Sequence, residues 1–361
     1  MSETRKGVRY VTWLLVATVG ILWAADASAR GGLEQYLPED TLVYISANDL
    51  SSYRLAFEGT ALYDIGQEPS VRRAIDQLRE LGRQRVEEEF GLSLDKIGNI
   101  FSGQVIVALT QLDIEKEKVG AILVADIESG KAASLKELLS AIEVRLRGSV
   151  PLEKQQTFTY NETEITLYEV DELTICYCFP RDRFALSIGT AGRETMESFL
   201  DNLANSPRAS LADDPEFRNI FARIGQGSHS FSFFNVGKLL DLLAQAAEDE
   251  DVPKLMEALG LRSVKAVGAT STIVGKGFKD VTYIHAPGER RGLMKLLGTQ
   301  SNVLEMLRYF PENVSSVSAF TIDFPGLWQE FLSVMRQLEP DEAEDMAEGI
   351  AEFEGQLGLS V

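Results

Sequence analysis

The sequence feature that most constrains the fold is a motif that occurs twice. A tyrosine, an apolar residue, a proline and a glutamate open the segment Tyr36–Thr41, and the same order opens Tyr309–Val314. Three further landmarks follow each copy at similar spacing: Asn48–Leu50 with Ile322–Phe324, Glu68–Ser70 with Glu339–Asp341, and Gly91–Leu94 with Gly358–Val361. Matched landmarks of this kind are typical of a repeated supersecondary unit. We therefore expect the same small group of strands and helices to form more than once.

Another version of the unit lies between these two copies. In it, Asn235 follows a strand predicted at Ser230–Phe234. Asn48 follows the strand predicted at Leu42–Ser46 in the same way. The later correspondences are Pro253 with Pro69, and Gly260–Leu261 with Gly91–Leu92. The pattern predicts three related units in tandem.

We divide the chain according to this repeat. Residues 1–29 are expected to form a signal peptide, and residues 30–204 a first α+β unit with an added meander of four strands. Residues 205–305 form the second unit, and its first nine positions, Asn205–Asp213, are a linker rich in serine and acidic residues. Residues 306–361 form a third unit, which we expect to be truncated before its strand pair and weakly buried at its end.

Apolar runs and amphipathic stretches predict the α+β class, with antiparallel sheets and amphipathic helices packed on them. The predicted strands are Leu42–Ser46, Gln104–Thr110, Val119–Asp126, Gln156–Tyr160, Glu164–Glu169, Leu173–Phe179, Phe184–Ile188, Ser230–Phe234, Ala266–Val274 and Asp280–His285. The predicted helices include Ser52–Phe57, Arg193–Leu203, Leu239–Ala246, Arg291–Leu297 and a longer one between Pro69 and Gly91. Asp214, before Pro215, is expected to cap one more helix.

The N-terminus has the three parts of a secretory signal peptide. Arg5, Lys6 and Arg9 give it a positive start. Val11–Ala25 forms an apolar core, and Ala27–Ala29 offers small residues for cleavage. The apolar run is short for a bilayer span, which needs roughly 20 residues. We expect cleavage, export to the periplasm, envelope or exterior, and no stable membrane insertion afterwards; an uncleaved anchor is the alternative.

The charge balance argues against nucleic acid and anionic lipid surfaces as partners. The net charge is −20, and removal of the signal peptide takes away three basic and two acidic side chains. So acidic a chain repels nucleic acid and anionic lipid surfaces, because phosphate binding needs a basic patch. The expected partner is instead an unknown protein or envelope ligand.

Cys176 and Cys178 are the only cysteines, which is few for an exported protein. They stand two residues apart on a predicted strand, so their side chains share a face and cannot bond without distortion. One interpretation is a redox or metal pair. The interpretation that we favour is two small buried apolar side chains, with no disulfide and no metal.

The histidines do not assemble a catalytic or metal site by spacing. His229 and His285 are the only two, and neither they nor the cysteines have the spacing of a metal cluster. The segment Gly225–His229 lacks the Gly-x-Ser-x-Gly order of a nucleophile elbow and precedes a strand. We therefore predict no catalytic, cofactor or metal residues.

Ser93 and Lys96 match the Ser-x-x-Lys pattern of penicillin-recognising enzymes. The companion motifs Ser-Asp-Asn and Lys-Thr-Gly do not occur in the chain. Ser93 is better explained as the cap of a short turn after Gly91. A hydrolase that uses Ser93 or paired carboxylates stays as the alternative to a non-enzymatic protein.

Three further patterns have simpler structural interpretations. Gly275–Gly277 is not a phosphate loop, because no serine or threonine follows its lysine. Glu248–Asp251 lacks the ligand spacing of a calcium loop and is expected to be a solvated charge run. Asn161 and Asn313 open glycosylation sequons, which matter only in a host that uses them.

Several of these segments resemble a family of secreted bacterial proteins, domain-of-unknown-function family thirty-three fifty-two. The matching segments are Leu37–Tyr44, Glu68–Pro69 at a helix start, Phe184–Leu203 and Ser210–Phe217. The resemblance covers nearly the whole chain after residue 29, although members tend to be longer. It implies an exported protein and carries no catalytic residue, because the family has no established activity. We therefore expect a non-enzymatic exported protein that binds a partner through a sheet face or edge.

Overall fold

The structure is a computed structural model, and it describes residues 32–90, 100–147, 154–204, 209–246, 251–288, 292, 295, 309 and 324–357. The signal peptide predicted at residues 1–29 lies outside the described residues, as do Ser93, Lys96 and Asn313. The acidic run at 248–250 and most of the helix predicted at 291–297 also lie outside them.

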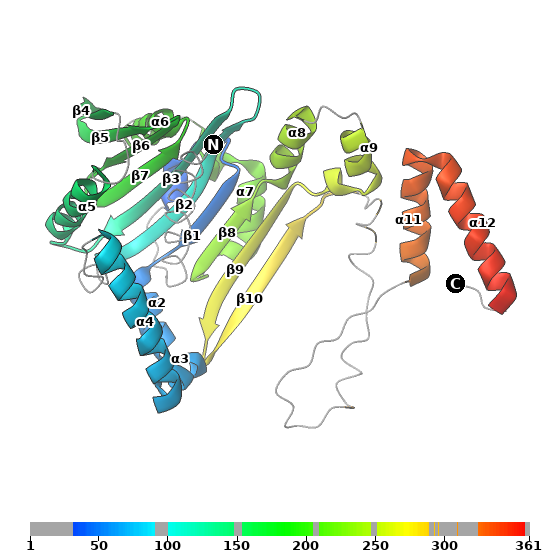
Figure 1. Cartoon of the computed structure of the whole chain (residues 1–361), viewed down its shortest axis with the longest axis horizontal. Helices are drawn as coiled ribbons and strands as arrows, with labels where there is room; N and C mark the ends of the chain where they lie inside the picture. Colours follow the sequence, from blue (N-terminus) through cyan, green and yellow to red (C-terminus); the bar gives the residue numbers. More distant parts are fainter. Residues whose placement is uncertain are drawn as a thin grey trace. The chain divides into compact units, whose positions relative to one another are not determined.

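Ten strands form one sheet in the order β10-β9-β8-β1-β2-β3-β7-β6-β5-β4 (Figure 1). The strands are β1 (Val43–Ala47), β2 (Phe101–Asp113), β3 (Lys118–Ile127), β4 (Lys154–Tyr160), β5 (Thr163–Val170), β6 (Leu173–Cys178), β7 (Arg183–Gly189), β8 (Ser230–Phe234), β9 (Ala266–Val274) and β10 (Gly277–His285). Neighbouring strands are antiparallel. Each predicted strand is present, and the α+β class with an antiparallel sheet is confirmed.

The helices follow the predicted pattern except at residues 61–67, where a helix forms that the sequence does not predict. They are α2 (Leu50–Glu58), α3 (Ala61–Gln67), α4 (Pro69–Phe90), α5 (Ala132–Arg147), α6 (Gly192–Ala204), α7 (Pro215–Ile220), α8 (Val236–Ala246), α9 (Asp251–Ala258), α11 (Phe324–Leu338) and α12 (Pro340–Leu357). The short turns are η1 (Leu33–Tyr36), η3 (Leu211–Asp213), η4 (Phe221–Gly225) and η5 (Leu261–Ser263). No helix in the described ranges has both the length and the apolar composition needed to cross a membrane.

The two faces of the sheet bury different sets of side chains. Val105 and Ile106 are adjacent in β2 and both buried, so side chains on both faces are covered there. We call the face that carries Ile106 the first face and the face that carries Val105 the second face. This arrangement agrees with the near-continuous apolar runs of the central strands.

The first face carries one continuous core. Its centre is a group of aromatic rings in which Phe217 of α7 contacts Tyr44 of β1 at 5.5 Å and Phe233 of β8 at 5.2 Å between ring centroids. Helix α6 extends this core over β6 and β7 with Met196 and Phe199. Contacts between rings and close packing of this kind dominate the stability of a core.

The second face carries two smaller clusters. Leu50 of α2 packs on Val105 and Ala125, and Leu135 of α5 packs with Ile127 and Phe184. Helix α4 contacts both α3 and α5. Among the described residues, the helices on this face bury fewer side chains than those on the first face.

The pairing of β1 with β8 has a symmetric register. Ile45 pairs with Ser232, and on either side of that pair Val43 is opposite Phe234 and Ala47 is opposite Ser230. Two backbone hydrogen bonds close the ends of this ladder: Asn48 N donates to His229 O at 3.1 Å, and Asn235 N donates to Leu42 O at 2.8 Å. The asparagine after each strand therefore makes the same contact with the other strand.

Aspartates cap helices where the sequence predicts caps. Asp214 accepts hydrogen bonds from the backbone N of Glu216 and Phe217, at 2.9 and 2.8 Å, and α7 begins at Pro215. Asp49 caps α2 through Ser51 N and Ser52 N. Both satisfy backbone donors that a helix start leaves without partners.

The prediction of a linker at Asn205–Asp213 is wrong for the residues of this segment that the structure describes. Leu211 is fully buried in the first-face core, and its backbone N donates to Leu37 O at 2.9 Å. Ser210 and Asp213 form a reciprocal capping box. The serine and acidic residues that suggested a linker therefore serve as helix caps, which use the same residue types.

The chain divides into two compact units, Met1–Asn235 with Ala266–Ile284, and Val236–Lys265 with His285–Val361. In the second unit, α11 packs against α9 and against α12. Leu332 and Val334 of α11 and Ala343 of α12 are buried. Most other described side chains of α12 are exposed, as the sequence predicts for this segment.

Candidate functional site

A hollow of about 1190 Å³ opens beside η1 in the first unit. Its walls are η1, the starts of β2 and β7, the end of β3 and the loop between η4 and β8. We call it the η1 cleft. Side chains from five separate parts of the chain meet there, which is the usual construction of a binding site.

A chain of hydrogen bonds runs along the base of the η1 cleft. The hydroxyl of Tyr44 donates to Glu34 Oε2 at 3.4 Å, and Gln104 Nε2 donates to Tyr44 Oη at 3.2 Å. Gln104 Oε1 accepts from Leu33 N at 2.9 Å, which fixes the orientation of the amide. The three side chains therefore hold one another in a single arrangement.

Burial changes the acid–base properties of two of these groups. It raises the pKa of Glu34, with hydrogen bonds from its own backbone and from Tyr44 opposing the shift. Burial and the nearby Glu34 carboxylate raise the pKa of Tyr44 well above its usual value, so the phenol keeps its proton. A carboxylate with a raised pKa in a cleft is the type of group that general acids use.

An ion pair forms a second wall of the η1 cleft. Arg183 Nε lies 2.9 Å from Asp126 Oδ1, and Gln104 N donates to Asp126 Oδ2 at 2.9 Å. The Arg183 guanidinium lies 5.7 Å from the ring centroid of Tyr36. A Cβ at Gly103 would lie 2.5 Å from Asp126 Oδ2, so this position needs glycine. The cleft thus presents carboxylate, amide, phenol and guanidinium groups in fixed positions.

The sequence gives no direct signal for the η1 cleft. Glu34 lies in a short helical turn and belongs to no recognisable motif. The sequence predicts a strand that begins at Gln104; Gln104 does lie in β2, but the strand begins earlier, at Phe101. A polar residue at an inward position of a strand was the one available sign that a partner lies opposite.

The structure keeps His229 and His285 in separate environments. His229 Nδ1 accepts a hydrogen bond from Ile273 N at 2.8 Å, and its ring packs against Tyr53 with centroids 6.2 Å apart. The backbone O of His285 accepts from Lys265 N at 2.8 Å, before the start of β9. The described residues do not bring the two histidines together in a triad.

Cys176 and Cys178 are unbonded and buried on the first face of β6. Cys178 Sγ lies 3.4 Å from Met196 Sδ. Burial raises the pKa of Cys176 to about 11 and that of Cys178 to about 12, so both thiols stay neutral near pH 7. Within the described residues, no group of three or more His, Cys, Asp or Glu side chains is placed to hold a metal ion. The environment of the pair is that of core residues.

Two other sequence patterns take structural roles. Asn161 Nδ2 donates to Asp201 Oδ1 at 2.8 Å, so the amide of this sequon is engaged in the fold. Lys276 lies in the hairpin turn between β9 and β10, and its Nζ lies 2.9 Å from Asp64 Oδ2. The turn leads into a strand, which agrees with the rejection of a phosphate loop.

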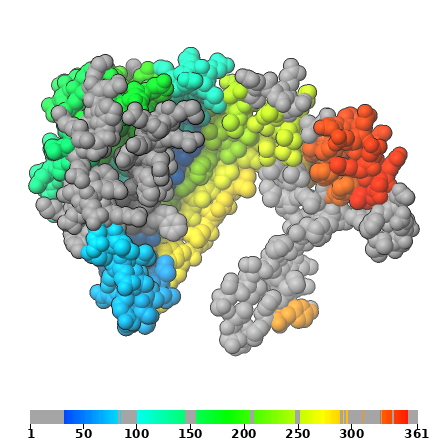
Figure 2. Space-filling model, viewed as in Figure 1, coloured from blue at the N-terminus to red at the C-terminus, as the bar shows by residue number. Residues whose placement is uncertain are grey.

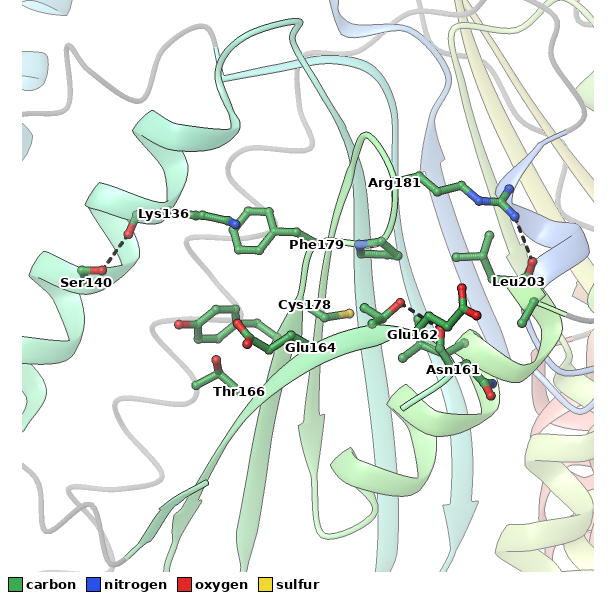
Figure 3. A pocket seen from close by; sticks show the side chains of 15 residues that line it. Lys136, Ser140, Asn161, Glu162, Glu164, Thr166, Cys178, Phe179, Arg181 and Leu203 are labelled. Carbon is green, nitrogen blue, oxygen red and sulfur yellow. Dashed lines mark hydrogen bonds between the residues drawn. The ribbon is translucent and has the colours of Figure 1, made fainter. Parts of the chain in front are cut away.

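A second hollow, of about 760 Å³, lies between α5, the turn before β5 and the end of β6 (Figure 3). Lys136 and Arg181 lie on one side of it, and Glu162 and Glu164 lie on the other (Figure 3). Lys136 Nζ is 4.9 Å from the ring centroid of Phe179. Arg181 Nη2 donates to Leu203 O at 3.4 Å. Two of its four charged side chains, Lys136 and Arg181, thus already contact the fold.

The sheet has two free edges within the described chain, β4 and β10. The hairpin of β4 and β5 turns at Asn161 and Glu162, whose φ angles are 44° and 62°. Its register is unbroken from Tyr160 opposite Thr163 to Lys154 opposite Glu169. Most of the described side chains of β4 are exposed.

Comparisons of the chain with family models, with curated proteins and with solved structures find no match in any of the three. Function must therefore be inferred from the geometry of this chain.

Proposed function

We propose that the protein acts without catalysis and binds an extended segment of a partner protein at the free edge of β4. An open edge strand offers backbone donors and acceptors that another strand can pair with. The observation that carries the proposal is that most of β4 lacks the features that protect such an edge. Its register with β5 has no bulge, and its one charged residue, Lys154, stands at the end farthest from the turn, so Gln155–Tyr160 offers an edge with no charged residue and no proline.

The turn geometry tells which groups of β4 are available. Positive φ at both turn residues makes a two-residue type I′ hairpin, in which the flanking residues Tyr160 and Thr163 form a hydrogen-bonded pair. Alternate residues then turn their N–H and C=O groups away from β5. Gln155, Thr157 and Thr159 are therefore the residues that face an added strand.

The other edge is better protected. β10 carries Lys279 and Asp280 near its middle, and charged side chains discourage strand addition. The same alternation, with Gly277 next to the turn, places the N–H of Thr282 on the open side of β10. β10 thus provides a matched edge at which we expect no partner.

The experiment compares proline at the two edges. Thr157→Pro removes an outward N–H from β4 without removing a hydrogen bond to β5, and Thr282→Pro does the same at β10. The chain without residues 1–29 is used to capture partners from a cell-envelope extract. A partner that binds the unaltered chain and Thr282→Pro, but is lost from Thr157→Pro, supports the proposal. Equal binding by all three proteins contradicts it.

We also propose that the strands on either side of the β1–β8 ladder belong to related units. The support is the register centred on Ile45 and Ser232, with equivalent hydrogen bonds from Asn48 and Asn235. Two copies of one unit meeting about a local two-fold axis produce such a register. The variants Asn48→Asp and Asn235→Asp test this. If the two positions are related, both substitutions should lower the free energy of unfolding by a similar amount.

We also propose that the protein is exported. Its support is the pattern of a positive start, an apolar core and small residues within residues 1–29, together with the resemblance to a secreted bacterial family. N-terminal sequencing of the protein recovered from outside the cytoplasm should read from Arg30. Recovery of the full chain, Met1 included, in the membrane fraction would contradict cleavage.

One observation favours the alternative of a hydrolase. Glu34 combines a raised pKa with a position in the η1 cleft beside Tyr44, so a carboxylate there could serve as a general acid. Glu34→Gln keeps the shape and removes the acid. Hydrolysis of a chromogenic ester or glycoside panel that falls at least about a hundredfold in this variant would favour the enzyme over the binding protein.

A further inference from the structure

The η1 cleft carries more negative than positive side chains. Its charged lining residues are the carboxylates Glu34, Asp49, Asp126, Glu128 and Asp182 and the guanidinium groups Arg181 and Arg183. All of them belong to the first unit. A hollow with such a surplus of one sign attracts an occupant of the opposite sign.

The two arginines do not neutralise this surplus. Arg183 pairs with Asp126, and Arg181 donates to Leu203 O. Asp49 is engaged as the cap of α2. Each guanidinium group of the cleft therefore contacts a group other than the remaining carboxylates.

Glu128 and Asp182 are the carboxylates of the cleft that stay available. Within the described part of the chain, neither side chain forms an ion pair or a hydrogen bond. The two residues lie close together, because the backbone N of Ile127, next to Glu128, donates to Asp182 O at 3.0 Å. A cation that enters the cleft thus finds two neighbouring carboxylates with no competing partner.

The chain enters the described structure at the wall of this cleft. Gly32 is the first described residue, and it lines the cleft. The Glu34 carboxylate accepts a hydrogen bond from the backbone of Gly32. A Cβ at Gly32 would collide with Glu34 Oε2, so the backbone runs against the cleft wall where only glycine fits.

The residues before Gly32 carry the complementary charge. The cleavage that is expected after Ala29 makes Arg30 the first residue, which adds an α-ammonium group to its guanidinium group. Gly31 adds no side chain that could block a close approach. Two residues span at most about 7 Å, so the α-ammonium group stays within about that distance of Gly32. A short segment with two positive charges and no negative one therefore begins beside the acidic cleft.

We propose that the N-terminus created by cleavage folds into the η1 cleft, where its α-ammonium group and the Arg30 guanidinium pair with Glu128 and Asp182. This inference rests on the proposed export and on cleavage after Ala29. In the uncleaved chain the same nitrogen is an uncharged amide that continues into Ala29, so the contact forms only after processing. The occupant of the cleft is then a segment of the chain itself.

The test measures how readily the α-amino group reacts. One form of the protein is released from a removable tag so that it begins at Arg30, and a second form begins at Ala27. Both react with acetic anhydride near pH 7, and mass spectrometry of the N-terminal peptide gives each rate relative to the same form unfolded in urea. The form that begins at Arg30 should react at least about threefold more slowly than its reference, because an ion-paired ammonium group keeps its proton. The form that begins at Ala27 should react at its reference rate.

Two matched pairs of substitutions locate the contact. Glu128→Gln with Asp182→Asn removes the two carboxylates and should restore the reference rate in the form that begins at Arg30. Asp64→Asn with Asp76→Asn changes the net charge equally in α3 and α4, which form the blue projection at the lower left of Figure 2. This control should leave the slow rate unchanged. Far-ultraviolet circular dichroism checks that each variant keeps its helices.

Equal relative rates for the two forms would overturn the proposal, as would a slow rate that survives Glu128→Gln with Asp182→Asn. The difference between the forms should shrink as the pH rises and the α-ammonium group loses its proton. A difference that persists would indicate burial without an ion pair and would also overturn it. Because the tag is removed in vitro, these results do not depend on where cells cut the chain. A failure of the proposed cleavage shows separately, in the N-terminal sequencing described above.

Discussion

The two faces of the sheet are formed by the same strands but differ in how completely helices bury their side chains. On the first face, Tyr44, Phe217, Phe231 and Phe233 are buried in one continuous core. On the second face, two smaller clusters share Phe101 and Leu123, and Leu78 of the nearby helix α4 is open to solvent. Alternate residues of one strand serve both faces, so the difference comes from the helices that cover them. We therefore expect the first face to contribute more of the free energy of unfolding than the second.

The largest expected effect is the loss of the ring at the centre of the first face. Phe217→Ala should lower the free energy of unfolding by about 3–5 kcal/mol, because it removes a buried aromatic ring and leaves a cavity. Leu78→Ala on the second face should change it by less than about 0.5 kcal/mol, since the side chain is exposed. Urea unfolding measures both. Equal losses would contradict the difference between the faces.

The next effect is a loss of stability at alkaline pH. Burial raises the pKa of Cys176 to about 11 and that of Cys178 to about 12, whereas an unfolded thiol ionises near 9. The folded thiols keep their protons to a higher pH than the unfolded ones, so the free energy of unfolding falls as the pH rises from about 9 to 11, on the order of 2 kcal/mol for each thiol. Unfolding at several pH values measures the slope. In the double variant Cys176→Ala and Cys178→Ala, the slope should be clearly smaller, although the fold is kept.

A smaller effect compares two helix caps on opposite faces. Asp214→Ala should lower the free energy of unfolding by about 1–2 kcal/mol, because its buried carboxylate caps α7 within the core. Asp49→Ala, which uncaps the more exposed α2, should lower it by about 0.5–1 kcal/mol. A greater loss for Asp49 would mean that the second face is the more cooperative of the two.

The smallest effect is a gain of stability. Burial raises the pKa of Glu34, so the folded state binds its proton more readily than the unfolded state does. Stability from this group is present at low pH and is lost as the pH rises through the raised pKa. Glu34→Gln should therefore raise the melting temperature slightly at pH 7 and leave it unchanged near pH 4. A lower melting temperature at pH 7 would show that the Glu34 carboxylate stabilises the fold.

Local features of the fold could be predicted from the sequence because local physics decides them. Pro69 begins α4, and Asp214 caps α7, because the start of a helix selects these residue types. Strand positions followed from apolar runs and from turn residues such as Asn161. These features depend on neighbours a few residues away.

The order of the strands could not be predicted in the same way. Nothing near Val43 in sequence indicates that β8 lies between β1 and β9, so the sequence suggested several sheets where the structure has one. The burial of Leu211 and the contact between Glu34 and Tyr44 also depend on distant segments. The candidate site was missed for this reason, since its residues meet only after the sheet has formed.

The pairing of β1 with β8 also affects the order in which the molecule can fold. Ser46 and Phe231 share a hydrogen bond across this ladder and are 185 residues apart in the chain. Contacts at such separation form late, because a long loop must close first. Until β8 arrives, β1 leaves its outer side and the ring of Tyr44 uncovered in the middle of the future sheet. A chain that folds from its N-terminus is thus most exposed to wrong strand pairing just before Ser230–Phe234 becomes available.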